Sequence, residues 1–240
     1  MKEIEGFVLQ SIDYKDNHKI LYLYSALGHH TLLAYNVKKM NNIQRFLSQR
    51  GSLIQYKIPE KPMAPLKDGE LINAYDTIKE DPIAYTRMLH ILELVRHVID
   101  DHSNHEKMFH FIKKIFNHMN RQLDSELYQY IFELKLLHFI GYGLNFKACS
   151  ICGKKTNLVF HPSSGGVICK QHVKDFSVSY PYDIYELLAH LYYIDVDHAS
   201  PRNLTHKQRI QIKEIITLLY DEFVGFHTKS SKILEQMQKI

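Results

Sequence analysis

Two closely spaced pairs of metal-binding residue types constrain the fold of this chain more than any other feature. In each pair two residues separate the two side chains, and the pairs are Cys149 with Cys152 and Cys169 with His172. Thiolate and imidazole ligands at this spacing suit tetrahedral Zn2+, because each tight turn brings two ligands to one ion. The sequence between the pairs predicts two short strands, at residues 158–160 and 166–169. We therefore predict a zinc ribbon within residues 144–174.

The ligand set indicates a structural zinc ion rather than a catalytic one. Four protein ligands fill a tetrahedral site, whereas a catalytic zinc ion keeps one position open for water or substrate. His161 is an alternative fourth ligand, although it lacks the two-residue spacing of the pairs. The His-x-Glu sequence that precedes the cysteine pair of nucleobase deaminases is absent, and no nucleophile triad or carboxylate pair stands out. We therefore expect one structural Zn2+ and no enzymatic activity.

The first 79 residues predict a small β-barrel. Five short apolar runs have the composition of strands, and they lie at residues 7–9, 20–24, 31–35, 53–58 and 70–75. Apolar residues on both faces of the second and third runs indicate a closed barrel whose outer face is partly covered. Five short strands are typical of an OB-fold, and the proline-rich residues 59–65 predict a loop before the last strand.

From residue 80 onward the apolar residues recur at helical spacing. Asp81 is a candidate N-cap, with Pro82 at the first helical position. The predicted fold class is therefore α+β. It combines a five-stranded, DNA-binding OB-fold barrel over residues 1–79 with an α-helical domain over residues 80–240 that contains the inserted zinc ribbon.

Basic residues gather in two zones of the sequence. Residues 36–67 hold seven Lys and Arg residues and one acid, and residues 145–174 hold five lysines and no acid. Two such zones fit a polyanionic partner, and solvated loops with a chance imbalance of charge are the alternative. The first zone supplies the candidate DNA-binding residues, which are Lys38, Lys39, Arg45, Arg50, Tyr35 and Lys57. The competing site consists of ribbon lysines, namely Lys147, Lys154, Lys155 and Lys170.

The sequence also argues against several classes of protein. No stretch approaches the roughly 18 uninterrupted apolar residues of a membrane span, and the acidic N-terminal segment does not resemble a secretion signal. The glycine-rich loops that hold phosphates in nucleotide-binding enzymes are absent. Three cysteines, two of them in one pair, suit a reducing cytosol better than a disulfide framework. We expect a cytoplasmic protein that does not contact a membrane.

The sequence around the first cysteine pair resembles the bacterial recombination-mediator RecO family. A helical segment that ends at a Gly-Tyr-Gly corner, residues 132–143, is followed directly by that pair. Residues 160–169 continue the similarity. The strand at residues 5–9, the region at 14–16 and the turn at 27–28 resemble the opening strands of the same family. The resemblance extends over essentially the whole chain.

This resemblance implies a DNA repair mediator. Proteins of this family bind single- and double-stranded DNA, anneal complementary strands and, with the partner RecR, help to load the recombinase onto coated single-stranded DNA. They also bind the acidic, hydrophobic C-terminal tail of single-stranded-DNA-binding protein, and this role implies nucleoid association in the cytoplasm. The family often has cysteine at the fourth ligand position, where this chain has His172. An OB barrel can stack bases on aromatic side chains, for which the candidates are Tyr22, Tyr24, Tyr35 and Tyr56.

Two points stay open at the level of the sequence. A pocket for an acidic, apolar peptide tail needs an apolar floor and a rim of Lys or Arg, and residues 145–174 or 202–213 are the candidate rims. A zinc-containing DNA-binding transcription regulator is the alternative function. It would need a recognition helix with basic and amide residues on one face. The helix that begins at Thr205, with the form of a capping box, is the candidate.

Overall fold

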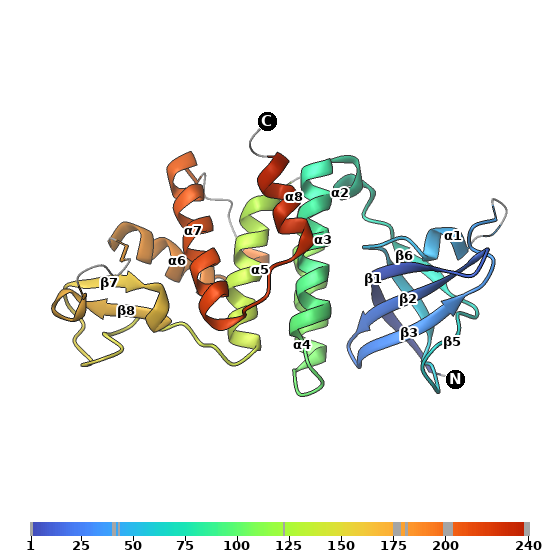
Figure 1. Ribbon diagram of the computed structural model, residues 1–240, viewed down its shortest axis with the longest axis horizontal. Helices are drawn as coiled ribbons and strands as arrows, with labels where there is room; N and C mark the ends of the chain where they lie inside the picture. The colour runs from blue at the N-terminus through green and yellow to red at the C-terminus, as the bar shows by residue number, and fades with distance from the viewer. Residues whose placement is uncertain are drawn as a thin grey trace. The chain divides into compact units, whose positions relative to one another are not determined.

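The computed structural model describes most of the chain, with short gaps. The described residues are 2–39, 42, 44–121, 123–174, 179–180, 182–198 and 204–237. They form two compact units, which are drawn in Figure 1. The first unit combines Met1–Ser125 with Thr228–Ile240, and the second is Glu126–His227.

A six-stranded sheet opens the first unit. The order of its strands is β5-β3-β2-β1-β4-β6. Their bounds are β1 Glu3–Tyr14, β2 His18–Ser25, β3 Gly28–Ala34, β4 Leu53–Lys57, β5 Ala64–Pro65 and β6 Glu70–Asn73. Neighbouring strands run antiparallel except β3 and β5, which are parallel. All five predicted strands are present, as β1, β2, β3, β4 and β6.

The prediction of a closed, five-stranded barrel is corrected in two respects. The proline-rich stretch predicted as a loop contains a sixth strand, β5. There the N–H of Met63 donates to the carbonyl of Thr31, and the N–H of Leu66 donates to that of Leu33, each at 2.9 Å. Because Pro65 has no N–H, this short strand fits only at the edge of the sheet. No ladder joins β5 to β6 among the described residues, so the sheet is open.

Both faces of the sheet are covered by apolar side chains. Successive strand residues point to opposite faces, and Phe7 and Val8 of β1 are both fully buried. On one face Val8 joins a cluster formed with other strands and with Leu47 of α1 (Gln44–Leu47). On the other face the Phe7 ring centroid lies 5.4 Å from that of Phe109 and 5.3 Å from that of Phe116. This double burial explains why the strands are apolar on both faces.

The other helices described in the first unit pack beside the sheet and beside one another. They are α2 Asp76–Glu80, α3 Pro82–Val98, α4 His105–Met119 and α8 Lys229–Met237. Asp81 caps α3 as predicted, since its carboxylate accepts from the N–H of Ile83 at 2.8 Å and Pro82 lies in the first turn. Helix α8 lies beside α3 (Figure 1), where the Ser230 hydroxyl donates to Glu93 at 2.9 Å.

The second unit holds the ribbon between two helices. Its helices are α5 Ser125–Phe139, α6 Tyr182–Tyr193 and α7 His206–Phe223, and its strands are β7 Leu158–His161 and β8 Gly166–Cys169. Short 3-10 turns come directly after β7, β8 and α6, at Pro162–Ser164, Lys170–His172 and Val196–His198 respectively. Gly166 lies against the carbonyl of Asn145, where an added Cβ would clash, so this position requires glycine. The two predicted ribbon strands are confirmed, and they pair antiparallel.

The compact units divide the chain at residue 125, whereas the predicted domains meet between residues 79 and 80. The difference arises because α3 contacts β1 and α4 contacts β2, so both helices belong to the same unit as the sheet. A functional division at residue 79 stays a prediction. Within the described part of the chain, no helix is long and apolar enough to span a membrane.

Candidate metal centre and nucleic-acid interface

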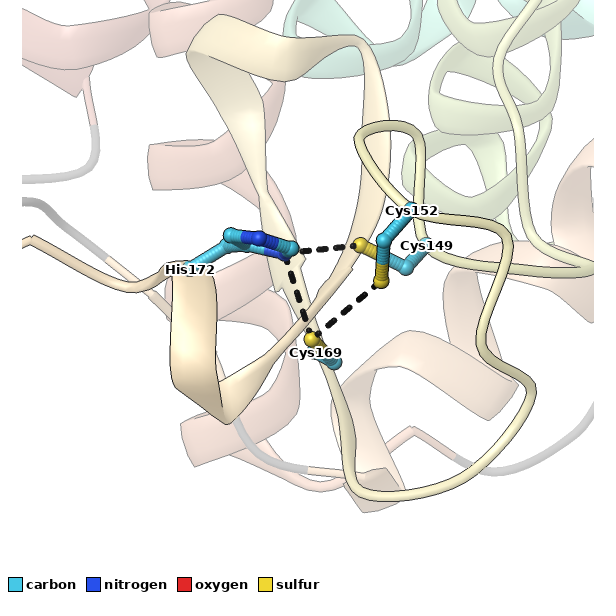
Figure 2. Close-up of side chains that lie close together, drawn as sticks. All are labelled: Cys149, Cys152, Cys169 and His172. Atoms are coloured by element: carbon cyan, nitrogen blue, oxygen red, sulfur yellow. Dashed lines mark hydrogen bonds between the residues drawn. The ribbon is translucent and has the colours of Figure 1, made fainter.

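Three cysteines and one histidine of the ribbon bring their ligand atoms together (Figure 2). The sulfur atoms of Cys149, Cys152 and Cys169 and a ring nitrogen of His172 all lie within 4.8 Å of one another. The Sγ atoms of Cys152 and Cys169 are 3.8 Å apart, and Nδ1 of His172 lies 3.5 Å from Sγ of Cys149 and 3.3 Å from Sγ of Cys169. Thiolates bound about 2.3 Å from a tetrahedral zinc ion are separated by about 3.8 Å. The group therefore has the dimensions of a zinc site and could hold a metal ion.

Two turns of the ribbon position these ligands. The N–H of Gly153 donates to the carbonyl of Cys149 at 2.9 Å, and the φ angle of Gly153 is 73°, which favours glycine in this turn. Cys169 ends β8, and the 3-10 turn that follows carries His172 toward the cysteines (Figure 2). His161, the alternative ligand, bonds a neighbouring hydroxyl through Nδ1 at 2.9 Å and lies outside the group. The histidine that lies with the three cysteines is therefore His172.

The pKa values of two of the clustered thiols are shifted in opposite directions. Burial acts to raise the pKa of Cys149, but hydrogen bonds from backbone N–H groups and from His172 outweigh it and lower that pKa to about 5. At Cys152 a backbone hydrogen bond at Lys154 favours the thiolate, but burial and the sulfur atoms of Cys149 and Cys169 raise the pKa above its usual value. Neighbouring thiolates repel one another, and a divalent cation removes this repulsion. The chemistry of the donor set therefore suits a bound cation.

The first unit contains a basic groove with a volume of about 840 Å3. Its walls come from β1, β2, α1, α2, α3 and the segment after β3. Five cationic side chains line it, from Lys19, Lys38, Arg45, Arg50 and Lys79. Three of the six predicted DNA-binding residues are among them, whereas Tyr35, Lys39 and Lys57 lie outside the groove. The fold thus gathers charges that stand far apart in the sequence.

The predicted DNA-binding residues differ in how far a carboxylate already balances their charge. Nζ of Lys38 lies 3.0 Å from Asp13, and Nζ of Lys57 lies 2.6 Å from Asp68. Each lysine lowers the pKa of its partner carboxyl, chiefly through the hydrogen bond between them. Both pairs lie at the surface, where such pairs are weak. Arg45 is exposed and forms no ion pair with any described residue, so its charge is the more available to a ligand.

Arg50 serves the fold as well as the groove. Its Nε donates to the carbonyl of Leu9 in β1 at 3.2 Å, and its guanidinium group lies 3.5 Å from Glu93 of α3. The side chain is half-buried. Arg50 therefore joins the sheet to α3, and its removal would change stability together with any effect on a ligand.

The structure corrects the hypothesis that four tyrosines stack on bases. Tyr24 and Tyr56 are fully buried, which raises the pKa of both hydroxyls well above the usual value, so neither ring can meet a base. Tyr22 is half-buried, and the guanidinium group of Arg96 lies 4.3 Å from its ring centroid. Tyr35 is 43% exposed. Of the four, Tyr35 is the one that presents an open ring.

Sequence reasoning missed several residues that line the groove, among them Lys19, Lys79 and Tyr85. Lys19 precedes the basic zone, and the other two lie where the acidic helical stretch begins. No local pattern marks them, because each is a single side chain on a separate element. Only the placement of β2, α2 and α3 around one hollow connects them.

Comparisons with known proteins show which family this chain resembles in sequence. Residues 79–232 match the family described as recombination protein O C terminal. This chain belongs to the RecO family. It is 26% identical to the DNA repair protein RecO of Bacillus cytotoxicus over 246 residues, which cover 99% of this chain and 98% of that protein. It is 25% identical, with the same coverage, to the proteins of that name from Bacillus cereus and Bacillus anthracis. The resemblance inferred from the sequence is confirmed.

The part of the chain that matches the RecO family also contains a second hollow, of about 730 Å3, beside β7. Lys155 and Lys170 stand on its wall, together with apolar and aromatic side chains from Leu158, Val159, Tyr180 and Tyr185. The two lysines, Leu158 and Val159 belong to the predicted zone 145–174 of this member of the RecO family, whereas Tyr180 and Tyr185 lie beyond it. Residues 202–203 of the other predicted rim lie outside the described residues.

Proposed function

We propose that this chain is a non-enzymatic DNA repair mediator that binds single- and double-stranded DNA and anneals complementary strands. With RecR it helps to load the recombinase onto single-stranded DNA coated by single-stranded-DNA-binding protein, at the nucleoid in the cytoplasm. The observation that carries the proposal is a groove with five cations in a chain of the RecO family. Annealing requires that phosphate repulsion between two strands be neutralised, and fixed cations do this without covalent chemistry.

The DNA-binding surface in this proposal is centred on the groove. Lys38, Arg45 and Arg50 contact the backbone from its walls, and Lys39, Tyr35 and Lys57 extend the surface beyond it. Contacts to phosphates carry no sequence information, so we expect unrelated DNA sequences to bind with similar affinity. This expectation also separates the proposal from sequence-specific regulators.

We further propose that the sheet is an OB-fold whose last strand is divided. In this interpretation β5 and β6 are two parts of one bent strand, separated by residues 66–69. Its first part, β5, pairs with β3 at one edge of the sheet, and its second part, β6, pairs with β4 at the other edge. The two edges are then connected by residues 66–69 of the chain rather than by a continuous ladder of hydrogen bonds. OB-folds are partly open barrels, which agrees with such a break.

The ribbon in this proposal holds one structural Zn2+. Cys149, Cys152, Cys169 and His172 bind it, and the ion supplies a cross-link between two turns of the ribbon. The four residues leave no ligand position for water or substrate, so their task is to hold the ribbon folded. The distances between their ligand atoms, all within 4.8 Å, support this assignment.

The hollow beside β7 is our candidate site for the C-terminal tail of single-stranded-DNA-binding protein. Lys155 and Lys170 would pair with carboxylates of the tail, and Leu158 and Tyr185 would receive its apolar side chains. Titration of a labelled tail peptide tests this. We expect saturable binding at low salt that weakens when both lysines are changed to Gln. Unchanged binding by that variant would exclude the hollow as the binding site for the tail. Lys147→Gln, which removes a ribbon lysine outside the hollow, is the control.

The alternative function, a zinc-containing transcription regulator, needs a free basic face at the start of α7. Arg209 is engaged instead, because its guanidinium group lies 2.7 Å from Glu126 and its carbonyl accepts from the Tyr130 hydroxyl at 3.3 Å. This engagement disfavours the regulator. Equal affinity for unrelated DNA sequences would exclude it.

A strand-annealing assay on DNA coated beforehand with single-stranded-DNA-binding protein tests the proposed function. We expect the wild-type chain to anneal coated complementary strands, and the double variant Lys38→Gln/Arg45→Gln to do so more slowly. Lys107→Gln removes an exposed charge of the same unit outside the groove and should anneal at the wild-type rate. Failure of the wild-type chain to anneal either coated or naked strands would contradict the proposal.

A further inference from the structure

One thiol of the candidate metal-binding group is open to solvent. Cys152 is exposed, whereas Cys149 and Cys169 are buried. When a divalent cation is bound, all three sulfur atoms are thiolates, so access rather than acidity decides which of them a dissolved oxidant reaches. Oxidation of cysteine follows thiolate character and exposure. Cys152 is therefore the sulfur atom that an oxidant meets first.

The sulfur atom of Cys149 is engaged by its neighbours. Three backbone N–H groups donate to it, those of Ile151, Cys152 and Cys169. Nδ1 of His172 lies 3.5 Å away. These contacts stabilise the thiolate of Cys149, and a thiolate stabilised in this way is a weaker nucleophile. Cys149 is therefore the least suited of the three to attack a second sulfur atom.

Cys169 is placed to form a bond with Cys152. Their sulfur atoms are 3.8 Å apart and come from different turns of the ribbon (Figure 2). A movement of less than about 2 Å brings them to the length of a disulfide bond, about 2.05 Å. Such a bond would join the same two turns that a bound metal ion joins.

The fourth member of the group limits oxidation to one such bond. The chain has three cysteines, and all three belong to the group. The imidazole of His172 forms no disulfide, so at most one S–S bond arises within the chain. Cys149 and His172 then remain as donors, and two donors do not complete the tetrahedral set of a structural zinc ion. One bond is therefore enough to release the metal.

We propose that the ribbon is a reversible oxidation site, at which hydrogen peroxide joins Cys152 to Cys169 and the metal ion is released. The thiolate of Cys152 attacks one peroxide oxygen, so an S–O bond forms, the O–O bond breaks and hydroxide leaves. The thiolate of Cys169 then attacks the oxidised sulfur, so the S–S bond forms, the S–O bond breaks and a second hydroxide leaves. The two sulfur atoms lose two electrons, and the peroxide gains them. The inference rests on the proposed structural Zn2+ and adds a modification to its site.

The new bond takes the place of the lost metal as a cross-link. The metal and the disulfide both tie the turn at Cys152 to the turn at Cys169. A disulfide stabilises a folded chain largely because it restricts the unfolded one. The oxidised, metal-free protein should therefore melt at a higher temperature than the reduced, metal-free protein.

Oxidation of the zinc-loaded full chain by equimolar hydrogen peroxide tests this inference. A chromogenic chelator measures the released zinc, and peptide mapping by mass spectrometry identifies the bonded cysteines. We expect Cys152 joined to Cys169, zinc released in step with that bond, and zinc binding restored by dithiothreitol. Dimedone, which traps sulfenic acids, should label Cys152 first. Cys169→Ser lacks the second thiol, so it should accumulate dimedone-labelled Cys152 without this bond.

The possible outcomes separate this inference from the proposed zinc site. A bond between Cys149 and Cys152, first labelling of Cys149, or oxidation without any disulfide would overturn the oxidation site. If Cys169→Ser is unfolded, dimedone labelling of the wild-type chain decides. Wild-type protein that binds no zinc would overturn the structural zinc ion. Peptide mapping and the two melting temperatures would then still decide whether Cys152 and Cys169 form the cross-link.

Discussion

The candidate metal-binding group and the basic groove are built in opposite ways. The group comes from two short pairs that one hairpin brings together, and its four ligand atoms face one another. The groove draws on five named elements and the segment after β3, and three of its five cations form no ion pair with a described carboxylate, although Asp13 also lines it. A closed set of mutually satisfied ligands stabilises a fold. An open set of cations remains available to an anionic ligand.

Loss of a metal ligand should have the largest effect. Cys149→Ser should abolish stoichiometric zinc binding and destabilise the second unit by several kcal/mol, because the binding energy of a structural metal is folding energy. Metal analysis together with thermal melting measures both. His172→Cys should keep the metal and His172→Ala should weaken it, whereas His161→Ala should change neither.

The result that would contradict this prediction is substoichiometric zinc in the wild-type protein, with no change of melting in Cys149→Ser. Loss of metal in His161→Ala would instead show that the fourth ligand is misassigned. If the protein still binds DNA after it has lost zinc, the ribbon group serves the fold and the groove serves the ligand, as the comparison states.

Two arginines of the groove should differ in their effect on stability. Arg50→Ala should lower the free energy of unfolding by about 1–3 kcal/mol, because it removes a charged hydrogen bond to Leu9 and leaves Glu93 without its cation. Arg45→Ala should change it by less than about 0.5 kcal/mol, as is usual for exposed side chains. Urea denaturation measures both values. Equal losses in the two variants would contradict the assignment of a structural role to Arg50.

How much the sequence predicts depends on how local each feature is. The spacing of Cys149 and Cys152 and the Asp81 cap before Pro82 are local signals. The structure confirms the cap and brings the two sulfur atoms into one group that could hold a metal ion. The short strand at Ala64–Pro65 has no apolar run to mark it, because it pairs through only two residues at an edge. From the sequence alone, Tyr24 could be an exposed ring on the sheet or a core residue. It is a core residue because His105 of α4 packs against it.

The groove shows the same limit for function. Arg45 belongs to a basic zone that the sequence reveals. Lys79 lies next to acidic residues in the sequence, and only the fold brings it to the groove, where its Nζ donates to Ser52 and Gln49. Residue pairs that are distant in the sequence meet only after the fold is formed. Counting charges along the sequence therefore finds only part of the groove lining and misses Lys79.

The smallest expected effect is a pH dependence in the first unit. Burial lowers the pKa of His29 and of His30 below the usual value of 6.5, with the charge of His105 adding to the effect at His29 and the Ile99 carbonyl and Asp101 opposing it. The unfolded chain then binds protons more readily, so this contribution is complete above about pH 6.5 and is lost as the pH falls toward the folded pKa values. His29→Gln should reduce the loss.

Thermal melting of the wild-type and His29→Gln proteins across this pH range measures the effect. Identical pH dependence in the two proteins would contradict it. Because acid also protonates the proposed zinc ligands of the second unit, the effect must be read from the difference between the variants rather than from the wild-type curve.

The central claim is that the groove of the first unit holds the nucleic-acid backbone, and the salt dependence of single-strand binding tests it most directly. Removal of two phosphate contacts in Lys38→Gln/Arg45→Gln should reduce the log–log slope by about 1.4, at about 0.7 for each contact. The control Lys107→Gln/Lys229→Gln removes two exposed charges of the same unit and should keep the wild-type slope. An unchanged slope in the folded Lys38/Arg45 variant would contradict the account and move the DNA site to the ribbon lysines.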